Sequence, residues 1–353
     1  MTLDVKPYIL PFDVVEAKSV EEYRAELPRS DVVLHSRESF VWSACGLNSD
    51  IHKLLVINRQ SKYRFADGDP SMSAHFHDYV VQIEERWNDY FSTRRQVLLF
   101  KPDSKVNLRP VANGIVRVNA GCSFHHLNDA LKKNGLCFPP TEKRDVDSYP
   151  MYFTDGRLEG ALVRNPPSAY DITLGPWVDR IAGLTLLTVT GELIHVDPES
   201  GWVYDGINLL ECVCGTNGAL GFLMDVDILT IPASLAPDVE IEEITGNRAP
   251  CTGGIFDPGV YLWCQRVPLE LLEYAVQSAR PFVRNIHRES GLMLGSCPLG
   301  HEIPRYDGDR AMFGHLGDRN IEFHDDKLVS RIQAAKKRLD PENRLCPRAI
   351  SIL

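Results

Sequence analysis

Three residues near the C-terminal end of the chain could move protons or bind a metal ion. His315 lies in the segment FGHLGDRN, and Glu322 and His324 follow shortly after it. If residues 320–324 form a strand, Glu322 and His324 point to the same face. Histidine and carboxylate side chains act as acids and bases, and they also bind divalent metals. We therefore expect catalytic residues here. A divalent metal on His315 and Glu322, or a structural role, are the other interpretations.

A second set of candidates lies earlier, in segments expected to be loops or strand ends. Loops often carry function because they tolerate irregular backbone on a rigid scaffold. An equally good interpretation of these residues is that they are solvated surface charges. The candidates are His287, Arg288, His301 and Arg305.

The composition of the chain excludes several classes of function. The 353 residues carry a net charge of -10 and contain no basic block, which argues against nucleic-acid binding. The N-terminal sequence MTLDVKPYILPFD lacks a signal-peptide pattern, and no apolar run is long enough to span a membrane. The nine cysteines form no CxxC pair. We expect reduced thiols, a cytoplasmic protein and a small-molecule substrate.

Alternating and helical hydrophobic patterns predict the elements that position these residues. Cys212 and Cys214 are expected to alternate on a strand as small buried residues. The apolar stripe of 74–94 predicts a packing face. Helices are expected over 19–27, 74–94, 123–135, 269–280 and 327–339. Strands are expected over 32–35, 54–58, 115–121, 221–232, 259–266, 291–296 and 311–316, with a strand pair in 183–196. A loop is expected over 160–175.

Five segments carry a family resemblance. Four of them, in order, are 116–140, 160–192, 210–232 and 336–347. Together they resemble the FAD-linked oxidases of the vanillyl-alcohol oxidase and p-cresol methylhydroxylase superfamily. FGHLGDRN (313–320) resembles the GHxGDGN motif of the branch that oxidises D-2-hydroxy acids. In that branch the motif's histidines bind a divalent metal close to the flavin. His315 matches the first histidine, and Glu322 stands in place of the second.

The resemblance implies an α+β fold, with a two-part FAD-binding domain of the p-cresol methylhydroxylase type and a small α+β cap. The FAD-binding domain would cover residues 1–235, in subdomains of about 1–135 and 136–235. The cap would cover 236–326, and 327–353 would return to the first domain as a closing helix. The implied reaction is oxidation of a small hydroxylated substrate by hydride transfer to FAD N5.

The same resemblance assigns cofactor-binding residues. The family's run of three glycines is replaced by Ser36 to Phe40, which contains Glu38 and no histidine or cysteine, so we expect noncovalent FAD. Glu159 and Ser168 also replace glycines of the family. The expected cofactor-binding residues are Ser36, Arg37, Ser39, Phe40, Gly160, Asn165, Ser168, Asp179, Gly218, Gly221 and Phe222.

Two further functions remain open. The altered glycine positions are compatible with a flavin-independent cyclase, isomerase or lyase of a biosynthetic pathway on the same fold. A non-catalytic subunit of a flavoenzyme complex, which would use the helix expected over 74–94 as its interface, is the third class. A homo-oligomer is compatible with each of them.

Overall fold

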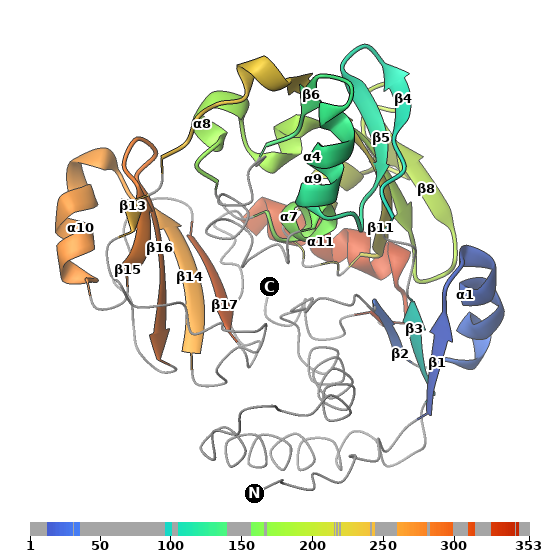
Figure 1. Ribbon diagram of the computed structural model, residues 1–353. Helices are drawn as coiled ribbons and strands as arrows, with labels where there is room; N and C mark the ends of the chain where they lie inside the picture. Colours follow the sequence, from blue (N-terminus) through green and yellow to red (C-terminus); the bar gives the residue numbers. More distant parts are fainter. Residues whose placement is uncertain are drawn as a thin grey trace, which may run out of the picture.

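The protein is a mixed helix and strand structure in which three sheets carry most of the described strands (Figure 1). This computed structural model describes residues 13–30, 32–35, 96–100, 105–139, 157–165, 168–214, 216, 218, 220–240, 242–243, 260–280, 283–298, 310–314, 326–342 and 344–345. The strand expected over 54–58 and the helix expected over 74–94 lie outside these residues.

The first sheet is parallel, with the strand order β1–β3–β2. The helix between β1 and β2 begins where the Ser19 hydroxyl accepts a hydrogen bond from the Glu22 backbone at 3.1 Å, which confirms the expected cap. The strand expected over 32–35 is also confirmed. The elements are β1 (Asp13–Ala17), α1 (Val20–Glu26), η1 (Leu27–Arg29), β2 (Val32–His35) and β3 (Gln96–Phe100).

The second sheet is antiparallel, with the order β4–β5–β11–β7–β8. The strand pair expected in 183–196 is present as β7 and β8. The strand expected over 221–232 breaks at Thr230, after which two residues pair with β6 instead. The strands are β4 (Arg109–Ala112), β5 (Ile115–Asn119), β7 (Ile181–Leu187), β8 (Leu193–Val196) and β11 (Phe222–Leu229).

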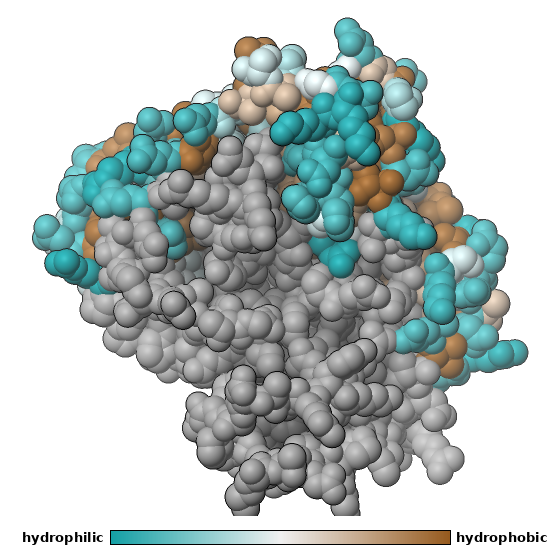
Figure 2. Space-filling view, viewed as in Figure 1, coloured by the Kyte–Doolittle hydropathy of each residue, from teal (hydrophilic) through white to brown (hydrophobic). Residues whose placement is uncertain are grey.

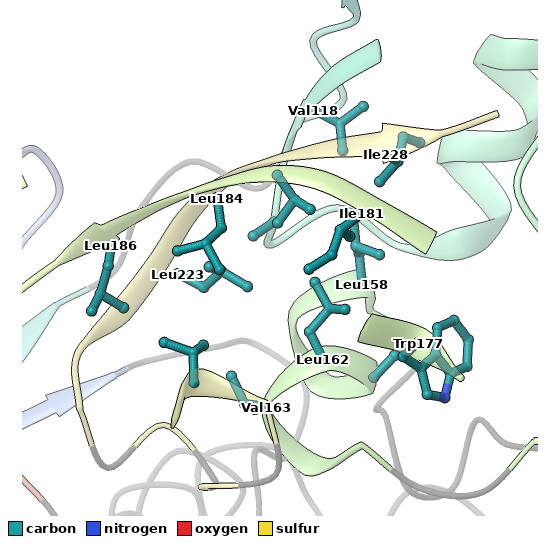
Figure 3. Packing of buried hydrophobic residues seen from close by; sticks show 14 of the residues in the cluster. Val118, Leu158, Leu162, Val163, Trp177, Ile181, Leu184, Leu186, Leu223 and Ile228 are labelled. Carbon is teal, nitrogen blue, oxygen red and sulfur yellow. The ribbon is translucent and has the colours of Figure 1, made fainter. Parts of the chain in front are cut away.

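Helices α4 and α7 contribute buried residues to the core of this second sheet. The helix α4 (Phe124–Lys132) begins at its expected cap, Ser123. In Figure 3, Leu158 and Leu162 of α7 (Leu158–Arg164) face Ile181 of β7. Each such buried aliphatic side chain stabilises the fold by about 1.5–3 kcal/mol.

Two expectations about the centre of the chain are wrong. The segment from Gly160, expected to be a loop, is part of helix α7 up to Arg164. Cys212 lies in the helix α9 (Leu209–Val213), not in a strand, and Cys214 is its C-cap. Both thiols are buried, as expected. The strand interpretation failed because Leu209, Cys212 and Val213, the buried residues, also have the i, i+3, i+4 spacing of a short helix that packs on one side.

A tight aromatic contact joins the first two sheets. The ring of Tyr23 lies 5.1 Å from that of Phe100 and 5.7 Å from that of Phe222, both edge to face. Tyr23 belongs to α1, Phe100 to β3 and Phe222 to β11. Edge-to-face aromatic pairs contribute about 0.5–1.5 kcal/mol beyond the area that they bury. The first sheet is therefore held against the start of β11.

The third sheet is antiparallel, with the order β13–β15–β16–β14–β17, and Figure 1 shows it with α10 to one side of the second sheet. We call this sheet and α10 the cap layer. Strands expected near 259–266, 291–296 and 311–316 are present, as is the helix in 269–280. The elements are β13 (Glu242–Glu243), β14 (Val260–Arg266), η4 (Leu269–Leu271), α10 (Leu272–Ser278), β15 (Val283–His287), β16 (Leu292–Pro298) and β17 (Arg310–Gly314).

The last helix, α11 (Asp326–Leu339), brings the chain back to the first two sheets. Ile332 packs into the core of the second sheet. In the last turn of the helix, the Lys336 ammonium donates to Asp340 at 2.5 Å. Beyond the helix, the Arg344 carbonyl accepts from the Val33 backbone N–H of β2 at 3.3 Å. The helix expected over 327–339 is confirmed.

The remaining described elements are short: β6 (Leu136–Cys137), α8 (Asp171–Leu174), η2 (Trp177–Arg180), β9 (Val203–Tyr204), β10 (Ile207–Asn208), β12 (Ile231–Pro232) and η3 (Ala233–Leu235). On the face shown in Figure 2, the coloured residues are mostly hydrophilic, with small separate hydrophobic patches. Within the described ranges, no helix is long and apolar enough to cross a membrane.

Candidate functional site

The residues expected to carry catalysis lie outside the described part of the chain, and β17 ends directly before the first of them. The same is true of four expected cofactor-binding residues and of two loop candidates. Their roles stay predictions. These residues are His315, Glu322 and His324, then Ser36, Arg37, Ser39 and Phe40, then His301 and Arg305.

The turn before β11 contains three expected cofactor-binding residues. Gly218 has a positive φ of 77°, which glycine adopts without strain. A Cβ on Gly221 would lie 2.6 Å from the Leu187 carbonyl oxygen, so no side chain fits there. The Phe222 ring is buried in the aromatic contact with Tyr23 and Phe100, and its side chain is occupied by packing. Gly218, Gly221 and Phe222 therefore offer a ligand backbone groups and no free side chain.

Two more expected residues lie on α7. Gly160 is buried in its first turn, where the neighbouring Leu158 and Glu159 N–H groups donate to the carbonyls of Cys122 and Ala120. Those two N–H groups are thus engaged by the protein itself. Asn165 ends the helix in the left-handed conformation, with φ 44°, and is exposed. Asparagine tolerates this conformation better than most residues because its short polar side chain can hydrogen-bond locally.

Ser168 and Asp179 are held by local contacts. Ser168 is fully buried, its N–H donates to Asp171 Oδ2 at 2.8 Å, and its hydroxyl accepts from the Tyr170 N–H at 3.2 Å. The Asp179 carboxylate lies so close to Gly175 that a Cβ there would be 2.9 Å from Asp179 Oδ2. The Ser168 N–H is therefore not free for a phosphate, and Asp179 has a packing role beside Gly175.

A buried ionic cluster surrounds Ser168. The Asp171 carboxylate, 8% exposed, accepts from Arg180 Nη2 at 3.0 Å on one oxygen and from Arg266 Nη2 at 2.9 Å on the other. Arg266 Nη2 also donates to the Ser168 carbonyl at 3.1 Å. Because Arg266 belongs to β14 of the cap layer, this cluster joins that layer to the segment with the expected cofactor-binding residues.

The charged groups of this cluster are held by hydrogen bonds to one another, but burying them costs desolvation free energy. Arg180 is 4% exposed, lies over the Trp177 ring at 4.8 Å, and donates through Nε to the Gly175 carbonyl. Burial lowers the pKa of Arg180 to about 10, against the opposing effect of Asp171, so the guanidinium is charged at pH 7. Burial also raises the pKa of Asp171, while the Ser168 N–H and Arg180 act against this. Each group therefore relies on the other for compensation.

His287 lies on the same face of the cap sheet as Arg266. In the register, Arg266 is opposite Leu292, and Leu292 is opposite His287, and opposed residues of antiparallel strands share a face. His287 is 4% exposed, and its Nδ1 lies 2.7 Å from Ser290 Oγ. Burial lowers the pKa of His287, Glu289 acts against this, and Arg266 reinforces it. The ring is therefore neutral at pH 7 and can accept a proton.

The two loop candidates that lie in the described ranges, His287 and Arg288, differ in their exposure to solvent. The interpretation of His287 as a solvated charge is wrong, since the ring is buried. The same interpretation is confirmed for Arg288, which is 49% exposed and pairs with Glu242 and Glu273. Sequence reasoning missed the cluster of Asp171, Arg180 and Arg266. A charged residue at the end of the apolar strand 260–266 was the available signal.

No metal centre is evident in the described ranges, where no group of three His, Cys, Asp or Glu side chains is arranged to hold an ion. The expected metal ligands lie outside those ranges. Among the described positions expected to bind the cofactor, the exposed Asn165 and the half-buried Gly218 are the ones open to a ligand.

Comparisons with known proteins give distant similarities. No protein-family model matches the chain. A D-lactate dehydrogenase of Anaerostipes hadrus is 25% identical over 121 residues, which are 34% of this chain and 24% of that protein. Among solved structures, alkyldihydroxyacetonephosphate synthase has 13% identity and a TM-score of 0.38, over 76% of this chain and 36% of the other. Physcomitrella patens BBE-like 1 has 10% identity and a TM-score of 0.40, over 85% and 54%. The chain thus spans less than two thirds of the length of each of these proteins.

Proposed function

We propose that the protein is a flavin-dependent oxidoreductase that binds FAD noncovalently and oxidises a small hydroxylated substrate. The observation that carries the proposal is the contact of cap-layer Arg266 with Ser168 and Asp171. It brings the face of the cap layer that carries Arg266 and the buried His287 onto the segment with the expected cofactor-binding residues. The similarity to a D-lactate dehydrogenase and the resemblance of the sequence to FAD-linked oxidases support the same class.

The described residues fit FAD in part. The half-buried Gly218 has a positive φ and room beside it, as a close approach of the adenine end of the cofactor would need, whereas Gly221 packs against Leu187. Asn165, at the end of α7, offers an exposed side-chain amide. The Ser168 N–H, by contrast, is held by Asp171, so pyrophosphate binding is assigned to the segment from Ser36 to Phe40, with Arg37 as its cation. The remaining parts of the proposal are the p-cresol methylhydroxylase-type domain in 1–235 and the cap in 236–326.

Oxidation of an alcohol requires a base for the hydroxyl proton and an acceptor for the hydride. FAD, when bound, supplies the hydride acceptor at N5. The chain supplies the base, for which we propose His315 or Glu322, with His324 beside them. A divalent metal on His315 and Glu322 would instead hold the substrate oxygens and acidify the hydroxyl. Elemental analysis of a fully active preparation decides this: one divalent ion per chain is expected if the metal takes part.

The experiment that tests the function is anaerobic reduction of the purified, flavin-loaded protein. D-lactate, L-lactate and a panel of other small 2-hydroxy acids and alcohols are added in turn. Bleaching of the flavin absorbance by at least one of them, and slower bleaching after His315→Ala, is the expected result. A flavin that dithionite reduces but that no hydroxylated compound bleaches would contradict the oxidase assignment. Turnover without flavin would favour the cyclase, isomerase or lyase class.

A further inference from the structure

Arg266 occupies a special position at the end of β14. Side chains alternate along a strand, and Trp263 and Val267 pack with α10 on one face of the cap sheet. Arg266 therefore projects from the opposite face, the one that also carries Leu292 and His287. Leu292 is fully buried, so this second face of the sheet is covered as well.

The backbone beside Arg266 is fixed tightly to the turn that follows β15. The Val267 N–H donates to the Gly291 carbonyl at 2.8 Å. Gly291 has φ 66°, and a Cβ on it would lie 2.0 Å from the Val267 carbonyl oxygen. The backbone segments at Val267 and Gly291 can approach this closely only with glycine at position 291. The base of the Arg266 side chain therefore moves with the cap sheet as a unit.

At its other end, the Arg266 side chain binds the Ser168 carbonyl directly and is linked to the Ser168 N–H through Asp171. The Ser168 carbonyl accepts directly from Arg266 Nη2. The Ser168 N–H donates to Asp171 Oδ2, the same oxygen that accepts from Arg266 Nη2. One guanidinium nitrogen thus completes a closed ring of hydrogen bonds through Ser168 and Asp171. Arg266 Nε, in contrast, is buried without a hydrogen-bond partner among the described residues.

From this geometry we infer that Arg266 is a positioning residue, which couples the place of the cap layer to the conformation of residues 168–175. The inference rests on the proposed function in one respect: the segment so held begins three residues after the exposed Asn165, which is an expected cofactor-binding residue. Arg266 does not itself need to contact cofactor or substrate. It acts through Ser168 and Asp171.

The geometry makes an unusual prediction about substitutions. Because a single nitrogen makes both cross-layer bonds, the one ammonium of Arg266→Lys can make them too once its stem, which is one bond shorter, extends toward Ser168 and Asp171. The same change removes Nε, a buried donor that has no partner. Arg266→Met keeps a long apolar stem but loses both bonds. We therefore expect rescue by lysine, although arginine and lysine are poor substitutes where two guanidinium nitrogens act together.

The first test measures hydrogen–deuterium exchange of a peptide covering 163–175 in the purified protein, without added cofactor, because the amide of Ser168 is retained only in a peptide that begins before it. Arg266→Met is expected to speed exchange of the Ser168 amide by about tenfold or more, since hydrogen bonds to charged groups are the stronger class. Arg266→Lys is expected to stay within about threefold of the wild type, on the same reasoning. A peptide covering β5 (115–119) is the internal control. Should Arg266→Met not fold, Arg266→Gln gives the same comparison.

The second test measures FAD affinity by quenching of flavin fluorescence on binding. Arg266→Met is expected to weaken binding about tenfold, and Arg266→Lys to restore it. Unchanged exchange in the methionine variant, or lysine behaving like methionine, overturns the positioning role. Faster exchange with unchanged FAD affinity overturns the coupling to the cofactor segment. If the wild type binds no FAD, the proposed function fails, while the exchange experiment still decides the role of Arg266.

Discussion

The substitution Asp171→Asn should destabilise the protein severely. The carboxylate is 8% exposed and accepts hydrogen bonds from Arg180, from Arg266 and from the Ser168 N–H. Asparagine would keep one acceptor but lose the charge, and its NH₂ group would face a guanidinium donor. Arg180, which is 4% exposed, would then be a buried charge without compensation.

The expected magnitude follows from that burial. Breaking a buried ion pair by removing one partner costs about 3–5 kcal/mol, several times the value of an exposed pair. At about 1.4 °C for each kcal/mol in a chain of this size, the midpoint of thermal unfolding should fall by about 4–7 °C. Thermal and urea unfolding, followed by circular dichroism, measure both quantities.

The control is Asp129→Asn, which removes a carboxylate that is 62% exposed beside His125. It should change the stability by less than about 0.5 kcal/mol. The double variant Asp171→Asn/Arg180→Met should be less destabilised than the sum of its single variants, because no buried charge on Arg180 remains. If Asp171→Asn destabilises no more than Asp129→Asn, the cluster does not hold the two layers together and the reasoning is wrong.

Two further predictions concern the turn before β11 and the histidine of the cap layer. Gly221→Ala should lower the urea midpoint, at a cost of about 1–3 kcal/mol, because its Cβ would meet the Leu187 carbonyl oxygen at 2.6 Å. Gly206→Ala, where a Cβ has open space, should cost about 1 kcal/mol through its positive φ alone, and equal losses would contradict the packing argument. Burial lowers the pKa of His287, so the unfolded chain takes up its proton first as the pH falls. Stability should therefore drop below about pH 6.5, and His287→Asn should reduce that drop whereas the exposed His126→Asn should not.

Helix caps and alternating strands were predictable from the sequence where local signals agreed with the packing. Ser123 opens α4 and Gly135, with a positive φ, follows its end, so the boundaries of that helix are encoded locally. The strand pair around Gly191 is similar, because alternation and a turn residue coincide.

The elements that were missed depend on contacts distant in sequence. Helix α7 has only seven residues and contains the helix-breaking Gly160, and its first turn is held by the carbonyls of Ala120 and Cys122. The strand β3 is a short apolar run whose partners, β1 and β2, come from another part of the chain. Short runs of this kind do not distinguish strand from helix.

The candidate site shows the same division. The sequence resemblance pointed to Ser168, but the contact of that residue with Arg266 joins positions 98 residues apart. No spacing within one segment reveals such a pair. His287 was recognisable as a chemically capable residue, whereas its burial results from the register of β14, β16 and β15. Residue type was therefore predictable, and the environment that sets its protonation was not.

The central claim of this account is that the chain is a flavoprotein. The most direct measurement is the amount of FAD bound by the purified protein after incubation with the cofactor, released by denaturation and compared with the protein concentration. We predict close to one FAD per chain. Denaturation should release it without proteolysis, since we propose that FAD binds noncovalently. A colourless protein that takes up no added FAD would contradict the claim.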